Sequence, residues 1–222
     1  MKTICICNQK GGVAKTTTAV NLAAILAMDF GKRVLVIDAD SQGNATSFLG
    51  GDKSRPGMAA LLQGAPMVPL QLTNTGTDMQ LIAASDELMD LDLTKAGEGK
   101  LALSCLNDLL QFLDTQPLPF DYCLIDCPPA FNAASSAALI AADAVLIPVK
   151  LDAFALEGMT NLMRQIQNMR RINPGLQLLG VLPVMWYRSD TITKAESALR
   201  NAGLKVLPRI RRSDRVDDMT YH

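Results

Sequence analysis

The sequence of 222 residues has no long apolar run: no stretch approaches the roughly 20 consecutive apolar residues that a membrane-spanning helix needs. It also lacks repeats and low-complexity segments. Because 49% of its residues are hydrophobic and 19% are charged, intrinsic disorder and fibrous arrays are excluded. The first residues lead directly into a glycine-rich loop and do not resemble a signal or transit peptide. We therefore expect a single cytoplasmic domain spanning residues 1–222.

Histidine is nearly absent, and cysteine occurs in an odd number. The cysteines are Cys5, Cys7, Cys105, Cys123 and Cys127, and the one histidine is His222. The spacings C-x-C and C-x3-C fall in or beside apolar segments that are typical of buried strands, and no second pair follows at zinc-like spacing. All of the cysteines except Cys127 lie among apolar neighbours, so we interpret these four as small buried apolar residues, and no structural metal is expected.

The net charge of −1 hides a strong asymmetry along the chain. Residues 1–163 carry 10 Lys and Arg against 17 Asp and Glu, a net charge of −7, whereas residues 164–215 carry 11 against 3, a net charge of +8. A basic third of this kind favours binding to a polyanion. The alternative interpretation is a set of solvated helix faces.

Short β-branched runs alternate with longer helical patterns, which predicts a mostly parallel, twisted sheet with helices on both faces. The predicted strands are Thr3–Cys7, Arg33–Ile37, Leu81–Ala84, Tyr122–Asp126, Ala144–Val149, Leu176–Pro183 and Lys205–Leu207. The predicted helices are Thr16–Phe30, Met58–Leu62, Asp86–Leu93, Lys100–Leu113, Asn132–Ala142, Leu156–Ile172 and Thr191–Ala202. The fold class is therefore α/β.

The segment KGGVAKTT, at residues 10–17, lies between a predicted strand and a predicted helix, which is the context that a phosphate-binding loop requires. Glycines let successive backbone N–H groups point at phosphate oxygens, and the helix N-terminus adds partial positive charge. We expect Lys15 to reach the β- and γ-phosphates, the Thr16 hydroxyl to complete a Mg²⁺ shell and Thr17 to lie near the α-phosphate. The remaining expected loop contacts are Gly11, Gly12, Val13 and Ala14. An ordinary glycine turn before a helix is the alternative.

This loop has the form K-G-G-x-x-K-[ST], with a lysine, Lys10, before the glycines, instead of the common G-x-x-x-x-G-K-[ST]. Together with NQKGG at 8–12, DADSQGNAT at 38–46 and DYCLIDCPP at 121–129, it resembles the ParA-type ATPases with a deviant Walker motif, which segregate plasmids and chromosomes. The resemblance covers nearly the whole chain and implies a P-loop NTPase fold with ATP and Mg²⁺ as cofactors. Ala14 departs from the usual glycine of that family, which puts the turnover rate in question.

Two carboxylates, Asp38 and Asp40, follow the second predicted strand, and Asp126 ends a later one. Alternation along the strand puts Asp38 and Asp40 on one side, at the edge where ligands bind in open α/β sheets. The resemblance implies that Asp40 orients the attacking water, while Asp38 supports the Mg²⁺ shell and Asp126 is the Walker B carboxylate. For each, a helix cap or turn is the alternative interpretation.

The resemblance also implies a homodimer around two ATP molecules, in which Lys10 reaches the nucleotide of the other subunit. We thus expect Lys10, Lys15 and Asp40 to be the catalytic residues, and weak intrinsic activity. Asp152, after a later strand, is a candidate contact with the dimer partner.

The base and DNA contacts are also implied by the resemblance. Adenine is expected near Met185, Pro208 and Arg209. The resemblance favours ATP over GTP, and no Asn-Lys-x-Asp guanine motif occurs. Nonspecific DNA binding is expected in the basic third. The candidate DNA-binding residues are Arg164, Arg170, Arg171, Arg188, Arg200, Arg211 and Arg212.

The first functional hypothesis is an ATP-driven DNA-partition switch whose hydrolysis is stimulated by a ParB-type centromere-binding protein, and which associates with the nucleoid when ATP-bound. The second is a MinD-like ATPase that positions a membrane or protein cargo; no amphipathic basic helix follows Arg215, so no membrane partner is expected. A nitrogenase-type iron protein would need cysteines beyond Cys127, and a dinucleotide oxidoreductase would need G-x-G-x-x-G. Without an N-terminal helix-turn-helix segment, operator binding by this chain is not expected.

Overall fold

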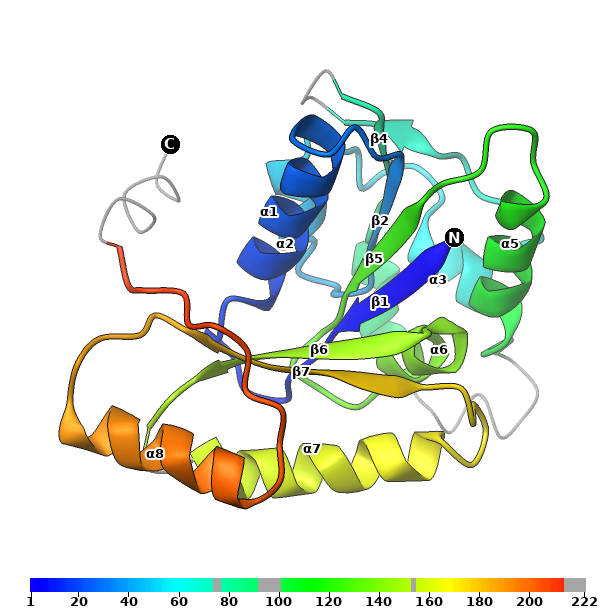
Figure 1. Cartoon of the computed structure of the whole chain (residues 1–222). Coiled ribbons are helices and arrows are strands. Elements are labelled where there is room, and N and C mark those ends of the chain that lie inside the picture. The colour runs from blue at the N-terminus through cyan, green and yellow to red at the C-terminus, as the bar shows by residue number, and fades with distance from the viewer. Residues whose placement is uncertain (74–76, 92–100, 153–154, 214–222) are drawn as a thin grey trace.

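The computed structural model describes residues 1–73, 77–91, 101–152 and 155–213. Within them, seven strands form one sheet in the order β3-β4-β2-β5-β1-β6-β7 (Figure 1). The strands are β1 (Lys2–Ile6), β2 (Val34–Asp38), β3 (Gln71–Leu72), β4 (Met79–Ile82), β5 (Tyr122–Asp126), β6 (Ala144–Lys150) and β7 (Gln177–Val184). The β3–β4 pair is antiparallel and every other pairing is parallel, so the predicted mostly parallel α/β fold is confirmed.

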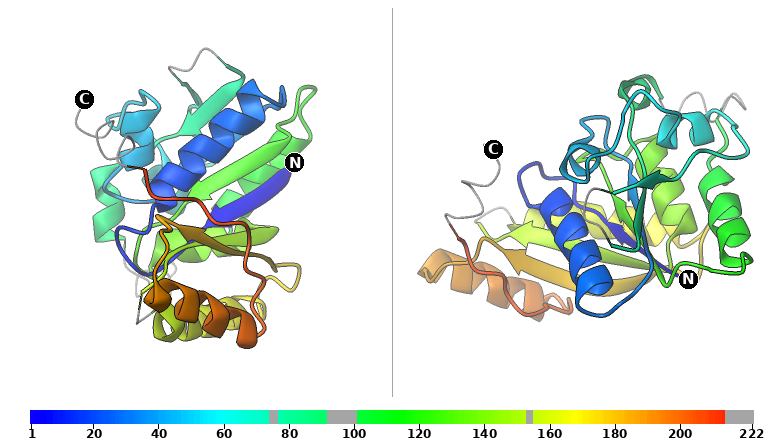
Figure 2. Two further views of the ribbon diagram at one scale, coloured as in Figure 1. Left: turned by 60° about the vertical axis from the view of Figure 1, so that its left-hand side comes forward. Right: turned by 90° about the horizontal axis from the view of Figure 1, so that it is seen from above.

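The helices connect the strands and cover both faces of the sheet (Figures 1 and 2). They are α1 (Lys15–Met28), α2 (Asn44–Phe48), α3 (Met58–Leu62), the 3₁₀ helix η1 (Asp86–Asp90), α5 (Cys105–Asp114), α6 (Ala133–Ala141), α7 (Ala155–Met169) and α8 (Asp190–Asn201). No helix in these described ranges is long and apolar enough to cross a membrane.

Two apolar clusters sandwich the sheet, because alternate strand residues point to opposite faces. On one face, Ile4 and Ile6 of β1 join Ala19 and Ala23 of α1. The opposite face buries Cys5 in the larger cluster, with residues of α3, α5, α6, α7 and α8. Strands covered on both sides read as continuous apolar runs, which is why their positions could be predicted.

Cys5, Cys7 and Cys123 are buried as predicted, and Cys127 is buried as well, whereas Cys105, also predicted to be buried, is partly exposed. All five are free thiols, and Sγ of Cys5 lies 3.1 Å from Sγ of Cys127. Burial raises the pKa of Cys105 to about 11. The four buried thiols pack as apolar side chains in the larger core cluster.

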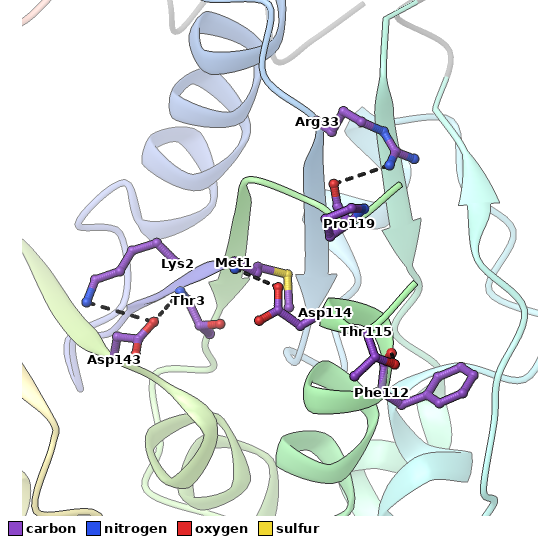
Figure 3. A network of polar contacts seen from close by, with 9 residues as sticks. All are labelled: Met1, Lys2, Thr3, Arg33, Phe112, Asp114, Thr115, Pro119 and Asp143. Carbon is purple, nitrogen blue, oxygen red and sulfur yellow. Dashed lines mark hydrogen bonds and ion pairs between the residues drawn. The ribbon is translucent and has the colours of Figure 1, made fainter. Parts of the chain in front are cut away.

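The amino ends of the strands are tied together by polar contacts (Figure 3). The N-terminal ammonium donates to Asp114 at 2.7 Å, and the Thr3 backbone N–H donates to Asp143, also at 2.7 Å. Arg33 donates to the Pro119 carbonyl at 3.2 Å. These contacts fix the sheet at the edge opposite to the phosphate loop, which leaves the carboxyl edge for ligands.

The structure differs from the prediction where elements are short. Neither α2 nor β3 is predicted: the first has five residues and no apolar periodicity, and the second has two residues that depend on pairing with β4. The expected strand Lys205–Leu207 is reduced to one bridge, between Val206 and Val181. This segment lies so close to β7 that a Cβ on Gly180 would meet the Lys205 carbonyl oxygen at 2.9 Å.

Two predicted helices are shorter than expected. Asp86–Leu93 is a 3₁₀ helix that ends at Asp90, and Lys100–Leu113 begins at Cys105. The rest of these predictions falls partly on residues 92–100, outside the described residues. The 3₁₀ geometry suits a single tight turn after β4.

Candidate functional site

Three adjacent strands, β2, β5 and β1, end at the same edge of the sheet. Asp126 of β5 is in register with Asp38 of β2 on one side and with Ile6 of β1 on the other. The loop of residues 8–17 follows β1 directly. The topology therefore brings the predicted phosphate loop and both predicted metal-site carboxylates together, where open α/β sheets bind ligands.

The loop backbone takes two left-handed residues before α1 begins. Gly12 has φ 67° and Ala14 has φ 57°. For Ala14 the left-handed conformation costs about 1–2 kcal/mol, so the surrounding structure must hold it. The Ala14 carbonyl accepts from the backbone N–H of Thr18 at 2.9 Å and from its hydroxyl at 2.7 Å. The helix thus starts from a fixed, curled loop of the kind that points N–H groups at an anion.

Lys15, the first residue of α1, is buried, and its ammonium points back over the loop. Its Nζ donates to the Lys10 carbonyl at 3.2 Å. Among the described residues this neutral carbonyl is the only hydrogen-bond acceptor of the buried ammonium, so its charge stays available for a phosphate oxygen. An ammonium lying over the loop is compatible with the expected contact between Lys15 and the β- and γ-phosphates.

Asp126 is buried, and neither of its carboxyl oxygens has a hydrogen-bond partner among the described residues. Burial, helped by the nearby charges of Asp38 and Asp40, raises the pKa of Asp126 to about 7, against the opposing effects of the Thr16 hydroxyl and Lys15. A buried carboxylate without a partner, beside a helix-start hydroxyl, is a donor set that suits a magnesium ion or its bound water.

Asp38, in contrast, is fully engaged with its own loop. Its Oδ2 accepts from the Thr46 backbone N–H and hydroxyl, and its Oδ1 accepts from the Asp40 backbone N–H at 3.2 Å. Burial raises the pKa of Asp38, and the bonds from Thr46 lower it. Asp40 is half-buried, and its Oδ1 accepts from the Gln42 N–H at 3.1 Å. Asp38 therefore fixes the loop that carries Asp40.

Lys10 is exposed and pairs with Asp152, which follows β6, within the same chain. Asn8 holds the base of this lysine: its side-chain amide donates to the Pro148 carbonyl at 2.7 Å and accepts from the Lys10 N–H at 3.0 Å. Gln9 donates to Gln165 of α7. The loop is thus anchored to β6 and α7 while the Lys10 ammonium stays at the surface.

A second feature of the same edge is a cavity of about 700 Å³ beyond the end of β7. Its lining residues are Trp186, Tyr187, Arg188, Thr193, Arg209, Arg211 and Arg212. The Arg209 guanidinium lies 4.2 Å from the ring centre of Trp186, a cation–π contact. Met185, which directly follows β7, has a left-handed backbone with φ 52°. The cavity combines a strongly positive lining with aromatic rings.

The structure separates the predicted DNA-binding arginines into groups. Arg188, Arg211 and Arg212 meet at the cavity. Arg170 and Arg171 follow α7, which runs antiparallel to the strands and so ends at the opposite edge of the sheet, where Arg170 donates to the Leu176 carbonyl at 2.9 Å. Arg164 lies on α7 and Arg200 lies on α8.

Sequence reasoning did not single out three residues that shape the site. Asn8 and Thr46 both lie in the segments that carry the family resemblance, but their hydrogen bonds depend on neighbouring strands. Glu196 contacts Arg200 and Arg209. Glu196 and Arg200 are four residues apart on a predicted helix, and this spacing is a signal that could have identified their ion pair.

Comparisons with known proteins agree with this geometry. A family model described as "AAA domain" matches residues 1–178. The chromosome partitioning protein ParA of Caulobacter vibrioides is 38% identical over 198 residues, which cover 87% of this chain and 73% of that protein.

Two solved structures share the fold over nearly the whole chain. Cobyrinic acid a,c-diamide synthase from Mycobacterium smegmatis, with bound ATP analogue and magnesium, is 32% identical with a TM-score of 0.84, covering 96% of this chain and 88% of that chain. Apo McdA of Cyanothece is 30% identical with a TM-score of 0.85, covering 98% and 88%. With the curled loop, the preceding lysine and the two strand-end carboxylates in place, these similarities establish that the chain belongs to the ParA-type ATPases with a deviant Walker motif.

Proposed function

We propose that the chain is an ATP-dependent switch for DNA partition: ATP binding drives dimerisation, the dimer binds DNA without sequence preference, and hydrolysis releases it. The observation that carries the nucleotide step is the buried, unpartnered carboxylate of Asp126 beside the curled loop and the Lys15 ammonium. Buried polar groups in proteins are nearly always paired, so an orphaned carboxylate here indicates a ligand site.

The residues present fit ATP and Mg²⁺. Backbone N–H groups of the loop and Lys15 would hold the phosphates, while the Thr16 hydroxyl and, through water, Asp126 would hold the metal ion. Bound Mg²⁺ supplies neutralisation of charge on the phosphates. The relative from Mycobacterium smegmatis that was solved with an ATP analogue and magnesium supports this choice of ligands.

Within the chain, Asp40 is the candidate for orienting the attacking water, because it is half-buried at the mouth of the site on a loop that Asp38 and Thr46 hold in place. Lys15 stabilises negative charge on the transferred phosphoryl group. With these groups alone the expected intrinsic hydrolysis is slow, since the second cation is Lys10 from a partner subunit.

Lys10 must leave Asp152 to reach the nucleotide of a second copy. The side chains of this ion pair are 47% and 35% exposed, and exposed pairs contribute only about 0–1 kcal/mol. The nucleotide phosphates can therefore displace Asp152 at little cost. Supplying the cation only in the dimer makes hydrolysis conditional on dimerisation.

In this proposal the adenine of ATP extends from the phosphate loop toward β7. The end of β7 is two strands away from β1, or roughly 10 Å at the usual strand spacing, which suits the length of a nucleotide. Met185, Pro208 and Arg209 follow β7 or run beside it. They are the proposed adenine contacts.

DNA is proposed to bind at the arginines around the β7 cavity. Arg188 and Arg211 are exposed and form no ion pair among the described residues, so their charge is available to phosphates. Dimerisation would double this surface and raise the avidity for DNA. A ParB-type centromere-binding protein is the proposed partner that stimulates hydrolysis.

Retention of purified protein on immobilised duplex DNA, measured across a salt series with ATP and Mg²⁺, with ADP and with neither, tests the proposal. We expect retention in ATP alone to persist to higher salt, and light scattering to show a dimer. Equal retention in the three conditions would refute the switch. Co-sedimentation with anionic liposomes in ATP, without DNA retention, would instead favour a MinD-like cargo-positioning role.

A further inference from the structure

Glu196 of α8 is a buried carboxylate shared by two arginines of the basic surface. Its Oε1 accepts from Nη2 of Arg200 at 3.0 Å, and its Oε2 lies 3.6 Å from Nε of Arg209. The carboxylate side chain is 9% exposed, whereas the side chains of Arg200 and Arg209 are 53% and 48% exposed. One internal anion thus joins a residue of α8 to a residue of the β7 cavity.

The surroundings of Glu196 explain why it stays paired. Removing either arginine from a buried carboxylate is costly, because the charge would lose part of its compensation without gaining water. Arg209 is held on its other side by the Trp186 ring. The carboxylate, the two guanidinium groups and the ring therefore form one contiguous group at the edge of the basic surface.

We propose that Glu196 is an internal counter-ion that occupies Arg200 and Arg209 and competes with nucleic-acid phosphates for Arg200. This inference rests on the proposed DNA-binding function and adds how the strength of that binding is limited. A phosphate that binds Arg200 must replace or weaken its contact with Glu196, whereas Arg188 and Arg211 carry no such internal anion among the described residues.

The competition has a distinct signature in the salt dependence of binding. Each phosphate that a protein neutralises steepens the slope of log affinity against log salt by about 0.9. Glu196→Gln keeps the shape of the side chain and removes its charge, so Arg200 becomes available. We expect the slope measured for Glu196→Gln to be steeper than that of the unmodified chain by about 1.

The matched control is Asp190→Asn, which removes the same charge from the exposed first turn of the same helix. Affinity for a duplex of fixed length is measured by fluorescence anisotropy at several salt concentrations in ATP and Mg²⁺. Glu196→Gln should bind roughly 3- to 10-fold more tightly at low salt than Asp190→Asn, with the steeper slope. Equal affinities and slopes for the two variants would overturn the proposal.

A second comparison needs no change at the buried position. Because Arg200 is already neutralised, Arg200→Gln should weaken DNA binding less than Arg188→Gln does. An equal or larger loss for Arg200→Gln would contradict the competition. In the Glu196→Gln background, Arg200→Gln and Arg188→Gln should weaken DNA binding equally. A double-mutant cycle measures this coupling between Glu196 and Arg200.

Elution from a heparin column separates this inference from the proposed function. If the chain retains no DNA but Glu196→Gln still elutes at higher salt than Asp190→Asn, the DNA-partition function fails and the competing role of Glu196 is supported. If DNA is retained in ATP but the variants elute together, the partition function stands and the inference fails.

Discussion

Asp38 and Thr46 are joined by two hydrogen bonds, because the backbone N–H and the hydroxyl of Thr46 both donate to Oδ2 of Asp38 at 2.7 Å. The Thr46 hydroxyl also accepts from the Ala84 N–H at 3.0 Å. Asp38 and Thr46 are fully buried. This pair connects the end of β2 to the residues after β4 and closes the loop on which Asp40 lies.

Thr46→Val should destabilise the fold by about 1–3 kcal/mol, since it leaves the Ala84 N–H without its acceptor and removes one donor from a buried carboxylate. Urea denaturation measures the change. Thr46→Ser is the control, because it retains the hydroxyl and should lose less. A Val variant as stable as the Ser variant would show that these bonds contribute nothing.

Ala14→Gly should stabilise the protein by about 0.5–1 kcal/mol. Glycine removes the cost of the left-handed conformation at φ 57°, which outweighs the extra freedom it gives the unfolded chain. Ala198→Gly, inside α8, is the control and should destabilise by about 1 kcal/mol. Denaturation of both variants checks the opposite signs, and steady-state hydrolysis shows whether the methyl group slows turnover.

The free energy of unfolding of Asp126→Asn should increase relative to that of the unmodified chain as the pH rises. In the folded protein the pKa of Asp126 is about 7, against about 4 in the unfolded chain, so between these values the folded state holds a proton that the unfolded state has lost. The stability of the unmodified chain therefore falls with increasing pH across this window, by up to about 1.4 kcal/mol per pH unit.

Urea denaturation at pH 5 and pH 8, without nucleotide or magnesium, measures this difference. Asp190→Asn controls for the loss of one negative charge. An Asp126→Asn advantage that is the same at both pH values would contradict the raised pKa. The Asn variant should also lose magnesium-dependent nucleotide binding.

Lys10→Ala should change the free energy of unfolding by no more than about 1 kcal/mol, because the Lys10–Asp152 ion pair that it removes is largely exposed. Its ATP hydrolysis should fall by roughly 10-fold or more, because the partner's nucleotide loses a cation that stabilises the transferred phosphoryl group. Light scattering and phosphate release test both statements. Asp152→Asn is the control, since it frees Lys10 without removing it, and hydrolysis should persist.

The sequence predicts this fold best where apolar runs end in punctuating residues. Tyr122–Asp126 is predicted with its observed bounds because the run stops at an aspartate followed by two prolines, and Met58–Leu62 is also matched. In contrast, α2 follows a left-handed Gly43 in a polar segment, and β3 exists only through its pairing with β4. Local patterns carry no information about such pairings.

In the candidate site, too, residue positions could be predicted from the sequence, but side-chain partners could not. The positions of Lys15, Asp38 and Asp126 follow from strand ends and motif spacing, and the structure brings them to one edge. Side-chain partners across the fold could not be predicted in this way. Arg209 meets Glu196 only because the chain returns beside β7 after α8, and this return is fixed by packing against Gly180.

The two outermost strands of the sheet offer little to another chain's backbone. On one side β3 is only two residues long, and on the other the segment around Val206 covers part of β7, where Val181 donates to Lys205 and accepts from Leu207, both at 2.8 Å. Strands shielded in this manner resist edge-to-edge aggregation. Sheet extension is therefore a disfavoured route for the association of two copies of this protein.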